Sequence, residues 1–150
     1  MSIPSQSFEQ YTVAFYNVEN LFDAINDSQV VDEDFTDFGR KNWTKNRYQK
    51  KLTKISDAIS KIGFELTGKL PAIVGLAEVE NKKVLHDLIT QPKLAQGTYD
   101  FIHYNSPDER GIDVALLYDT RFFIPSHSEP LVIHLENEEG VRDATRDILY

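Results

Sequence analysis

The stretch "VAFYNVENLFD", residues 13–23, begins with the alternation of a β-strand and ends in a cluster of polar side chains. Its apolar and aromatic residues favour a strand over residues 11–18. Asn17 and Glu19 then follow two positions apart, where the strand is expected to end. A turn would explain this interruption. A metal site is the other explanation, because hard cations take amide and carboxylate oxygens as ligands.

A second apolar strand ends in a similar way. "PAIVGLAEV", residues 71–79, is a nearly continuous apolar run that predicts a strand buried on both faces. Its one charged residue, Glu78, lies next to its end. Because strand ends line the functional crevice in layered α/β folds, Asn17, Glu19 and Glu78 are candidates to bind Mg²⁺ together. A strand-end carboxylate also serves as a cap or an ion-pair partner, so the spacing alone leaves that alternative open.

Between these strands, an acidic run is followed by a basic one. Residues 23–37 carry acidic side chains and no Lys or Arg, which predicts an exposed loop. Residues 40–54 are rich in Lys and Arg, and an apolar stripe predicts a helix that is capped by Thr44 and ends before Gly63. The bases predict a solvated helix face, with a phosphate-binding patch as the alternative.

The rest of the chain alternates between helical and strand patterns. Asn81 is a candidate cap for a second helix. Strands are expected over residues 101–104, 113–118 and 131–135, and the segment 145–150 is expected to start another strand. The polar stretch "SPDERG", residues 106–111, is expected to form the hairpin loop between the first two strands. This order of elements predicts mixed α/β layers.

Two arginines are candidates to bind a substrate phosphate. Arg110 lies in "DERGIDVALLY" at the mouth of the expected hairpin, and Arg146 lies in "TRDILY" before a strand. The planar fork of Arg suits phosphate oxygens. An ordinary ion pair, with Asp108 or Asp143, is the structural alternative for either residue.

Composition limits the classes of function. The length of 150 residues suits one domain, and the net charge of -8 argues against a nucleic-acid footprint over the whole surface. The absence of Cys excludes disulfides, thiolate zinc sites and cysteine nucleophiles. No apolar run approaches the ~20 residues of a membrane span. Residues 1–10 have no signal-peptide pattern, which leaves cytoplasmic and processed secreted locations open.

Four segments, taken in chain order, resemble the endonuclease/exonuclease/phosphatase superfamily, in particular its uncharacterised bacterial branch. They are "FYNVENLFD", "GLAEVEN", "DERGIDVALLY" and "TRDILY", and the resemblance runs over residues 11–150. The resemblance implies a four-layer α-β-β-α sandwich. It also implies a Mg²⁺- or Mn²⁺-dependent hydrolase that cleaves phosphate esters by in-line attack of water.

The resemblance also assigns roles to single residues. Asn17 matches the motif Asn that contacts metal or phosphate, and Glu78 matches the principal metal-ligand Glu, so these two are the implied catalytic residues. Glu19 occupies a position where some members carry an Asp close to the metal. Arg110 and Arg146 fall near positions that face the substrate phosphate.

The later motifs of the superfamily, an Asp-x-Asn pair and a C-terminal Asp and His, have no counterpart in this sequence. We therefore expect residues 1–150 to be the N-terminal portion of a single domain that carries the front half of the active site. An incomplete second sheet would favour self-association. The alternative function is a non-catalytic binding module of the same fold. The substrate class is left open among phosphate esters, with nucleic acid as one candidate.

Overall fold

A four-stranded sheet forms the centre of the molecule. The computed structural model describes residues 9–136 and 138–150. The strands, in their order across the sheet, are β1 (Val13–Leu21), β2 (Ile73–Val79), β4 (Asp113–Asp119) and β3 (Tyr99–His103). β1 and β2 are parallel, whereas β4 is antiparallel to both β2 and β3. The predicted hairpin between β3 and β4 is confirmed.

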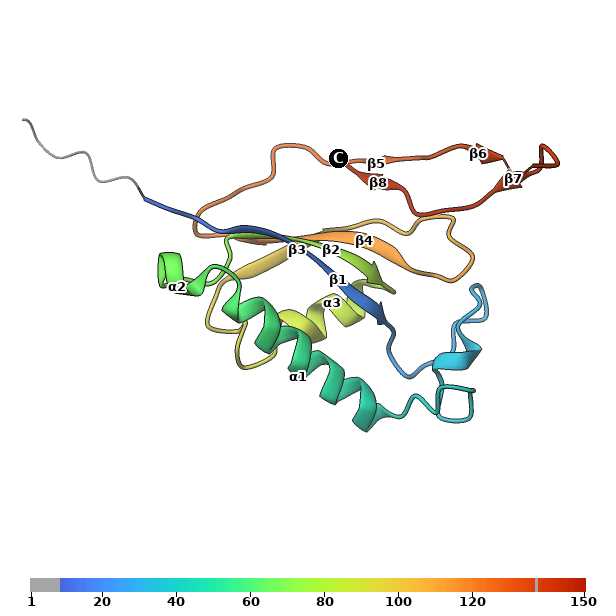
Figure 1. Cartoon of the computed structure of the whole chain (residues 1–150), viewed down its shortest axis with the longest axis horizontal. Helices are drawn as coiled ribbons and strands as arrows, with labels where there is room; N and C mark the ends of the chain where they lie inside the picture. Colours follow the sequence, from blue (N-terminus) through green and yellow to red (C-terminus); the bar gives the residue numbers. More distant parts are fainter. Residues whose placement is uncertain (1–8, 137) are drawn as a thin grey trace, which may run out of the picture.

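Helices cover one face of this sheet (Figure 1). They are α1 (Lys45–Lys61), the short α2 (Phe64–Thr67) and α3 (Lys82–Ile89), preceded by a 3-10 turn, η1 (Glu33–Phe35). Both predicted caps are confirmed. The Thr44 hydroxyl accepts a hydrogen bond from the backbone N–H of Arg47 at 3.3 Å, and the Asn81 side chain accepts one from that of Val84 at 3.0 Å.

The core lies between the helices and the sheet. The apolar stripe of α1 supplies Tyr48, Leu52, Ile55 and Ile59, all of them buried. They pack with buried residues of β1, β2, β4 and α3, among them Val18, Leu21, Val74, Leu76, Val79, Leu85, Leu88 and Leu117. This helix-period stripe on a sheet face is the interaction that fixes α1 beside the end of β1.

Substitution of Leu52 by Ala is expected to lower the free energy of unfolding by about 2–5 kcal/mol, because it leaves a cavity in the core. Leu52 is 0% exposed. Urea unfolding followed by far-ultraviolet circular dichroism measures the change. Leu66→Ala is the matched control, since Leu66 is 84% exposed. Equal effects of the two substitutions would contradict the assignment of Leu52 to the core.

A second β layer lies over the opposite face of the sheet (Figure 1). It consists of β5 (Pro130–Leu131) paired with β8 (Ile148–Leu149), and of β6 (Leu135–Glu136) paired with β7 (Arg142–Asp143). The strand predicted over residues 131–135 is thus two short pieces. Helices, main sheet and second β layer follow one another as in an α/β sandwich, which confirms the predicted fold class. Among the described residues, no helix covers the outer side of β5 and β8.

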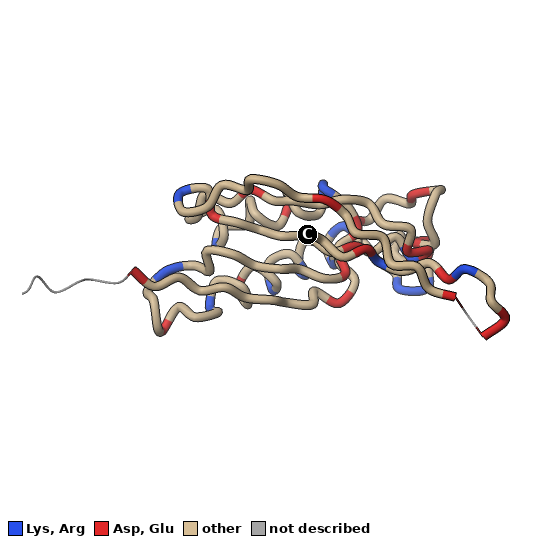
Figure 2. Tube along the Cα trace, turned by 90° about the horizontal axis from the view of Figure 1, so that it is seen from above, with Lys and Arg blue, Asp and Glu red and all other residues tan. Residues whose placement is uncertain are grey.

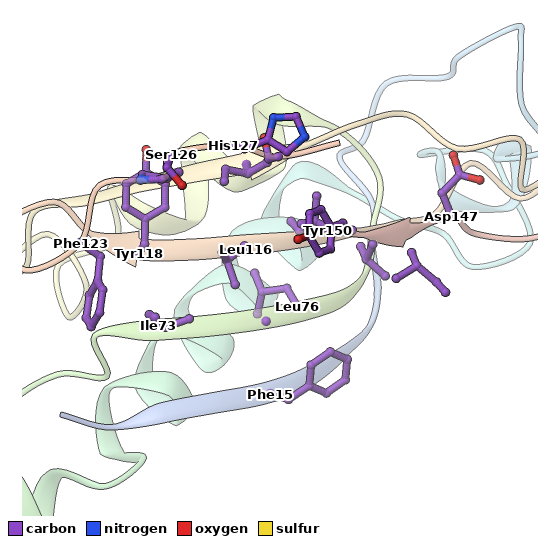
Figure 3. A pocket seen from close by; sticks show the side chains of 18 of the residues that line it. Phe15, Ile73, Leu76, Leu116, Tyr118, Phe123, Ser126, His127, Asp147 and Tyr150 are labelled. Carbon is purple, nitrogen blue, oxygen red and sulfur yellow. The ribbon is translucent and has the colours of Figure 1, made fainter. Parts of the chain in front are cut away.

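An apolar cavity of about 670 Å³ separates the two β layers (Figure 3). Phe15, Ile73, Leu116 and Tyr150 are among the residues that line it. Phe15 is 72% exposed, so the face of the main sheet opposite the helices is only partly covered. Self-association through this face stays a prediction. None of the helices within the described residues has the length and apolar character needed to cross a membrane.

Candidate functional site

The site predicted from the sequence lies where β1 and β2 end. Because these strands are parallel and adjacent, their carboxyl ends meet at the same edge of the sheet. The pairing is regular up to Asn17 opposite Ala77 and resumes at Leu21 opposite Val79. Three residues of β1 therefore face the single residue Glu78 of β2. Such a bulge redirects side chains at the end of a strand.

The backbone at this bulge is in the left-handed region, which is rare for residues other than Gly. The φ angles are 55° for Glu19, 63° for Asn20 and 69° for Glu78. The bulge also interrupts the alternation of side chains along β2. Leu76 and Val79 are three positions apart and would point to opposite faces of a regular strand, but both lie in the core beneath the sheet. Glu78 is thereby turned away from that core. Strained backbone of this kind is concentrated at functional sites, where the surrounding structure holds it in place.

Two hydrogen bonds hold the Glu78 carboxylate. The side-chain amide of Asn17 donates to Glu78 Oε1 at 3.0 Å, and the backbone N–H of Asn20 donates to Glu78 Oε2 at 3.1 Å. The amide oxygen of Asn17 accepts from the backbone N–H of Glu19 at 2.7 Å. The structure thus brings together the three residues predicted at the strand ends. Their roles as metal ligands stay predictions.

The two candidate arginines lie near Glu78. Arg146, in the segment between β7 and β8, places Nη1 at 3.7 Å from Glu78 Oε1. Arg110 holds Asp108 through Nε and Nη2, at 3.0 and 2.8 Å. The hydrogen bond with Asp108 raises the pKa of Arg110, burial opposes the rise, and the charge of Glu78 adds to it. Asp108 is therefore the ion-pair partner of Arg110, whereas Glu78 rather than Asp143 is that of Arg146.

The donor set fits a hard divalent cation. Each oxygen of Glu78 accepts one hydrogen bond from Asn17 or Asn20, which leaves lone pairs for a further partner. No group of three His, Cys, Asp or Glu side chains in the described part of the chain is arranged to hold a metal ion. A closed cage of that kind is not required by Mg²⁺, which is commonly bound through one or two carboxylates together with waters and substrate phosphates.

Lys51 of α1 also lies beside the site and was not predicted as a site residue. Its ammonium group donates to the backbone carbonyl of Glu19. Burial lowers the pKa of Lys51, while the charges of Glu19 and Glu78 oppose this shift. The sequence places Lys51 among the bases of α1, but the helical period alone predicts a solvated face. Only the packing of α1 beside the end of β1 brings this lysine to the site.

Three buried carboxylates lie behind the strand ends. The backbone N–H of Asp23 donates to Glu80 Oε2 at 2.6 Å, and that of Asp27 donates to Asp32 Oδ2 at 2.9 Å. Asp23 is only 5% exposed and Asp32 only 2%, so the prediction of a wholly exposed loop over residues 23–37 is wrong. The structure folds this loop back over the end of β2, where the backbone N–H groups compensate for part of the buried charge.

Burial shifts the titration of two of these groups. It raises the pKa of Glu80 to about 8; the hydrogen bond from Asp23 opposes the shift, and the charges of Asp23, Asp32 and Asp27 add to it. Burial also raises the pKa of Asp32 above its ordinary value. The Oδ1 atom of Asp32 is buried and has no hydrogen-bond partner among the described residues. Glu80 is therefore expected to be largely protonated near neutral pH.

Comparison with known proteins gives one positive finding. Residues 12–150 match the model of a family described as the Endonuclease/Exonuclease/phosphatase family. No curated protein matches the chain, and no solved structure matches it either. The matched residues include both strand ends and both candidate arginines.

Proposed function

Because the chain belongs to the endonuclease/exonuclease/phosphatase family, we propose that it is a metal-dependent hydrolase that cleaves phosphate esters by in-line attack of water. The observation that carries this proposal is the pair of bulged strand ends, which present the Glu78 carboxylate between the Asn17 amide and the Arg146 guanidinium. A fixed carboxylate beside a cationic fork suits a cation and a phosphate bound next to each other.

Each polar group at the strand ends has a role in this proposal. Glu78 would hold the divalent cation, Mg²⁺ or Mn²⁺, through the lone pairs that its two hydrogen bonds leave open. Asn17 orients Glu78 with its amide N–H, and Glu19 adds negative charge at the edge of the site. When bound, the cation would polarise a phosphoryl oxygen and stabilise the charge on the leaving oxygen.

The arginines orient the phosphate in this proposal. Arg146 reaches Glu78 from the second β layer. It would therefore face a phosphate that is bound to a cation at this carboxylate. Asp108 fixes the fork of Arg110 through Nε and Nη2 and leaves Nη1 without a hydrogen bond to any described residue. Two guanidinium forks beside the reacting phosphate would restrict its orientation, which favours in-line attack.

Removal of divalent cations is expected to abolish hydrolysis of bis-p-nitrophenyl phosphate. The physical reason is that the arginines orient the phosphate but do not replace the cation, which would stabilise the charge on the leaving oxygen. Release of p-nitrophenol is measured after treatment with EDTA and again after addition of excess Mg²⁺ or Mn²⁺, which is expected to restore the rate.

A parallel assay with Glu78→Gln protein distinguishes turnover by this site from a contaminating hydrolase. Hydrolysis that persists unchanged in EDTA would contradict the metal dependence. If neither bis-p-nitrophenyl phosphate nor an oligonucleotide is hydrolysed with either metal, the hydrolase proposal is wrong, and a binding module of the same fold becomes the better explanation.

A further inference from the structure

One face of α1 carries four cationic side chains beside the candidate site. Arg47, Lys50, Lys51 and Lys54, here called the basic shelf, follow one another at helical spacing. Together with Asn17, Glu19 and Trp43, they line a cavity of about 460 Å³. The shelf therefore shares this cavity with the end of β1, where Asn17 donates a hydrogen bond to Glu78.

The positive charges of the basic shelf outnumber the carboxylates beside it, of which Glu19 and Glu78 act on Lys51. None of its four residues forms a salt bridge within the described part of the chain. By contrast, Lys61 near the other end of α1 pairs with Asp57 at 2.6 Å, and Lys83 of α3 pairs with Asp87 at 2.7 Å. Acidic and basic positions lie close together at the end of the molecule where β1 and β2 finish (Figure 2).

Trp43 holds two of the four shelf residues in place. The Arg47 guanidinium lies 5.5 Å and the Lys51 ammonium 5.6 Å from the centre of the Trp43 ring. Trp43 is buried, and its indole N–H donates to the carbonyl of Phe22 at 3.0 Å. Arg47 also donates to the carbonyls of Lys41 and Asn42. Cations fixed in this way lose less conformational entropy when they bind an anion than freely moving surface lysines do.

The spread of the shelf indicates the size of its ligand. Residues 47–54 of a helix span about 10 Å along its axis, because the rise is about 1.5 Å per residue. This is wider than a single phosphate group. Arg146 reaches Glu78 from the second β layer, which lies over the face of the sheet opposite α1 (Figure 1), so cations approach the strand ends from both faces of the sheet.

We propose that the basic shelf binds a second phosphate of the substrate, next to the phosphate held at Glu78. The preferred substrates then carry phosphates in series, as in an oligonucleotide strand or a linear polyphosphate, rather than one isolated ester. The inference rests on the proposed function for the identity of the reacting phosphate, but the anion site itself consists of residues that the hydrolytic step does not use.

Equilibrium binding of a fluorescein-labelled oligothymidylate tests the shelf without any turnover. Fluorescence anisotropy is measured in EDTA with Glu78→Gln protein, in which the labelled strand stays intact. Addition of Lys50→Ala and Lys54→Ala is expected to weaken binding at low salt by about tenfold. The slope of log affinity against log salt is expected to fall by about 0.7, which is the change for one lost phosphate contact to a single strand.

The matched control carries Lys61→Ala and Lys93→Ala in the same Glu78→Gln background. It removes the same charge from exposed lysines that do not line the cavity. An equal loss of affinity in both double variants, or no measurable binding of the labelled strand, would overturn the proposal. Competition with tripolyphosphate identifies the source of the phosphates, because strong displacement indicates a compact polyphosphate and weak displacement a nucleotide strand.

Hydrolysis of bis-p-nitrophenyl phosphate separates this inference from the proposed function. That substrate has one phosphate, so Lys50→Ala with Lys54→Ala, in protein that keeps Glu78, is expected to leave its hydrolysis within about twofold of wild type. If wild-type protein binds the strand through the shelf but hydrolyses nothing, the proposed function fails and the anion site stands.

Discussion

Substitution of Glu78 by Gln is expected to lower kcat/KM for bis-p-nitrophenyl phosphate by about 100-fold or more. Gln keeps the length of the side chain and an oxygen for the N–H of Asn20, but it removes the negative charge that would hold the cation. Loss of about 3 kcal/mol of transition-state stabilisation corresponds to about 100-fold in rate. Initial rates at saturating Mg²⁺ measure the effect.

Glu136→Gln is the control for this substitution. It makes the same chemical change at an exposed position on β6, away from the ends of β1 and β2. Its rate is expected to equal that of wild type. Since Glu78 has left-handed backbone, the circular dichroism spectrum and the Tm of both variants are compared with those of wild type. A folded Glu78→Gln protein with wild-type kcat/KM would exclude Glu78 from the reaction.

The parts of the fold that depend on short-range patterns were predictable from the sequence. The stripe Tyr48, Leu52, Ile55, Ile59 and the cap at Thr44 determine α1, and both signals lie within the helix or beside it. The hairpin of β3 and β4 follows from two apolar runs around a polar loop. By contrast, the strand expected over residues 131–135 is interrupted, because its pairing depends on partners after residue 141 that a local pattern does not specify.

The candidate site was predictable in part. Parallel strands that follow one another end at the same edge, so the proximity of Asn17 to Glu78 follows from the order of elements alone. The bulge does not follow, because no residue at positions 18–20 or at 78 is a Gly that would mark left-handed backbone. The ion pair of Arg146 with Glu78 also escapes sequence reasoning, since the second β layer is what brings them together.

The buried acids illustrate the opposite limit, where a local pattern predicts the wrong environment. A run of acidic residues is typical of solvated loops. Here the loop is fixed by hydrogen bonds from its own backbone, including that of Asp23 to Glu80. Trp43 stabilises the same loop, since its ring packs edge-on against that of Phe35, which stacks on Phe22. The acids are thus buried because aromatic packing draws the loop inward.

This burial makes the stability of the chain depend on pH through Glu80. Its pKa is raised from an ordinary value near 4.5 to about 8, first by burial and then by the charges of Asp23, Asp32 and Asp27, against the hydrogen bond from Asp23. Between these two values the folded chain binds a proton that the unfolded chain has released. The free energy of unfolding therefore falls as pH rises from about 4.5 to about 8. Above the pKa of Glu80 in the folded chain, this group causes no further fall.

Substitution of Glu80 by Gln is expected to remove most of this fall. Gln mimics the protonated carboxyl, and its oxygen still accepts the N–H of Asp23. At about pH 5, the free energy of unfolding of the variant is expected to equal that of wild type. At about pH 9, it is expected to be higher than that of wild type by a few kcal/mol. Urea unfolding followed by the fluorescence of Trp43, the single Trp of the chain, measures the difference at each pH. Glu65→Gln, at an exposed position on α2, is the control and is expected to leave the free energy of unfolding unchanged at both pH values. Parallel curves of stability against pH for wild type and Glu80→Gln would show that Glu80 is ionised in the folded chain and that its burial has no such consequence.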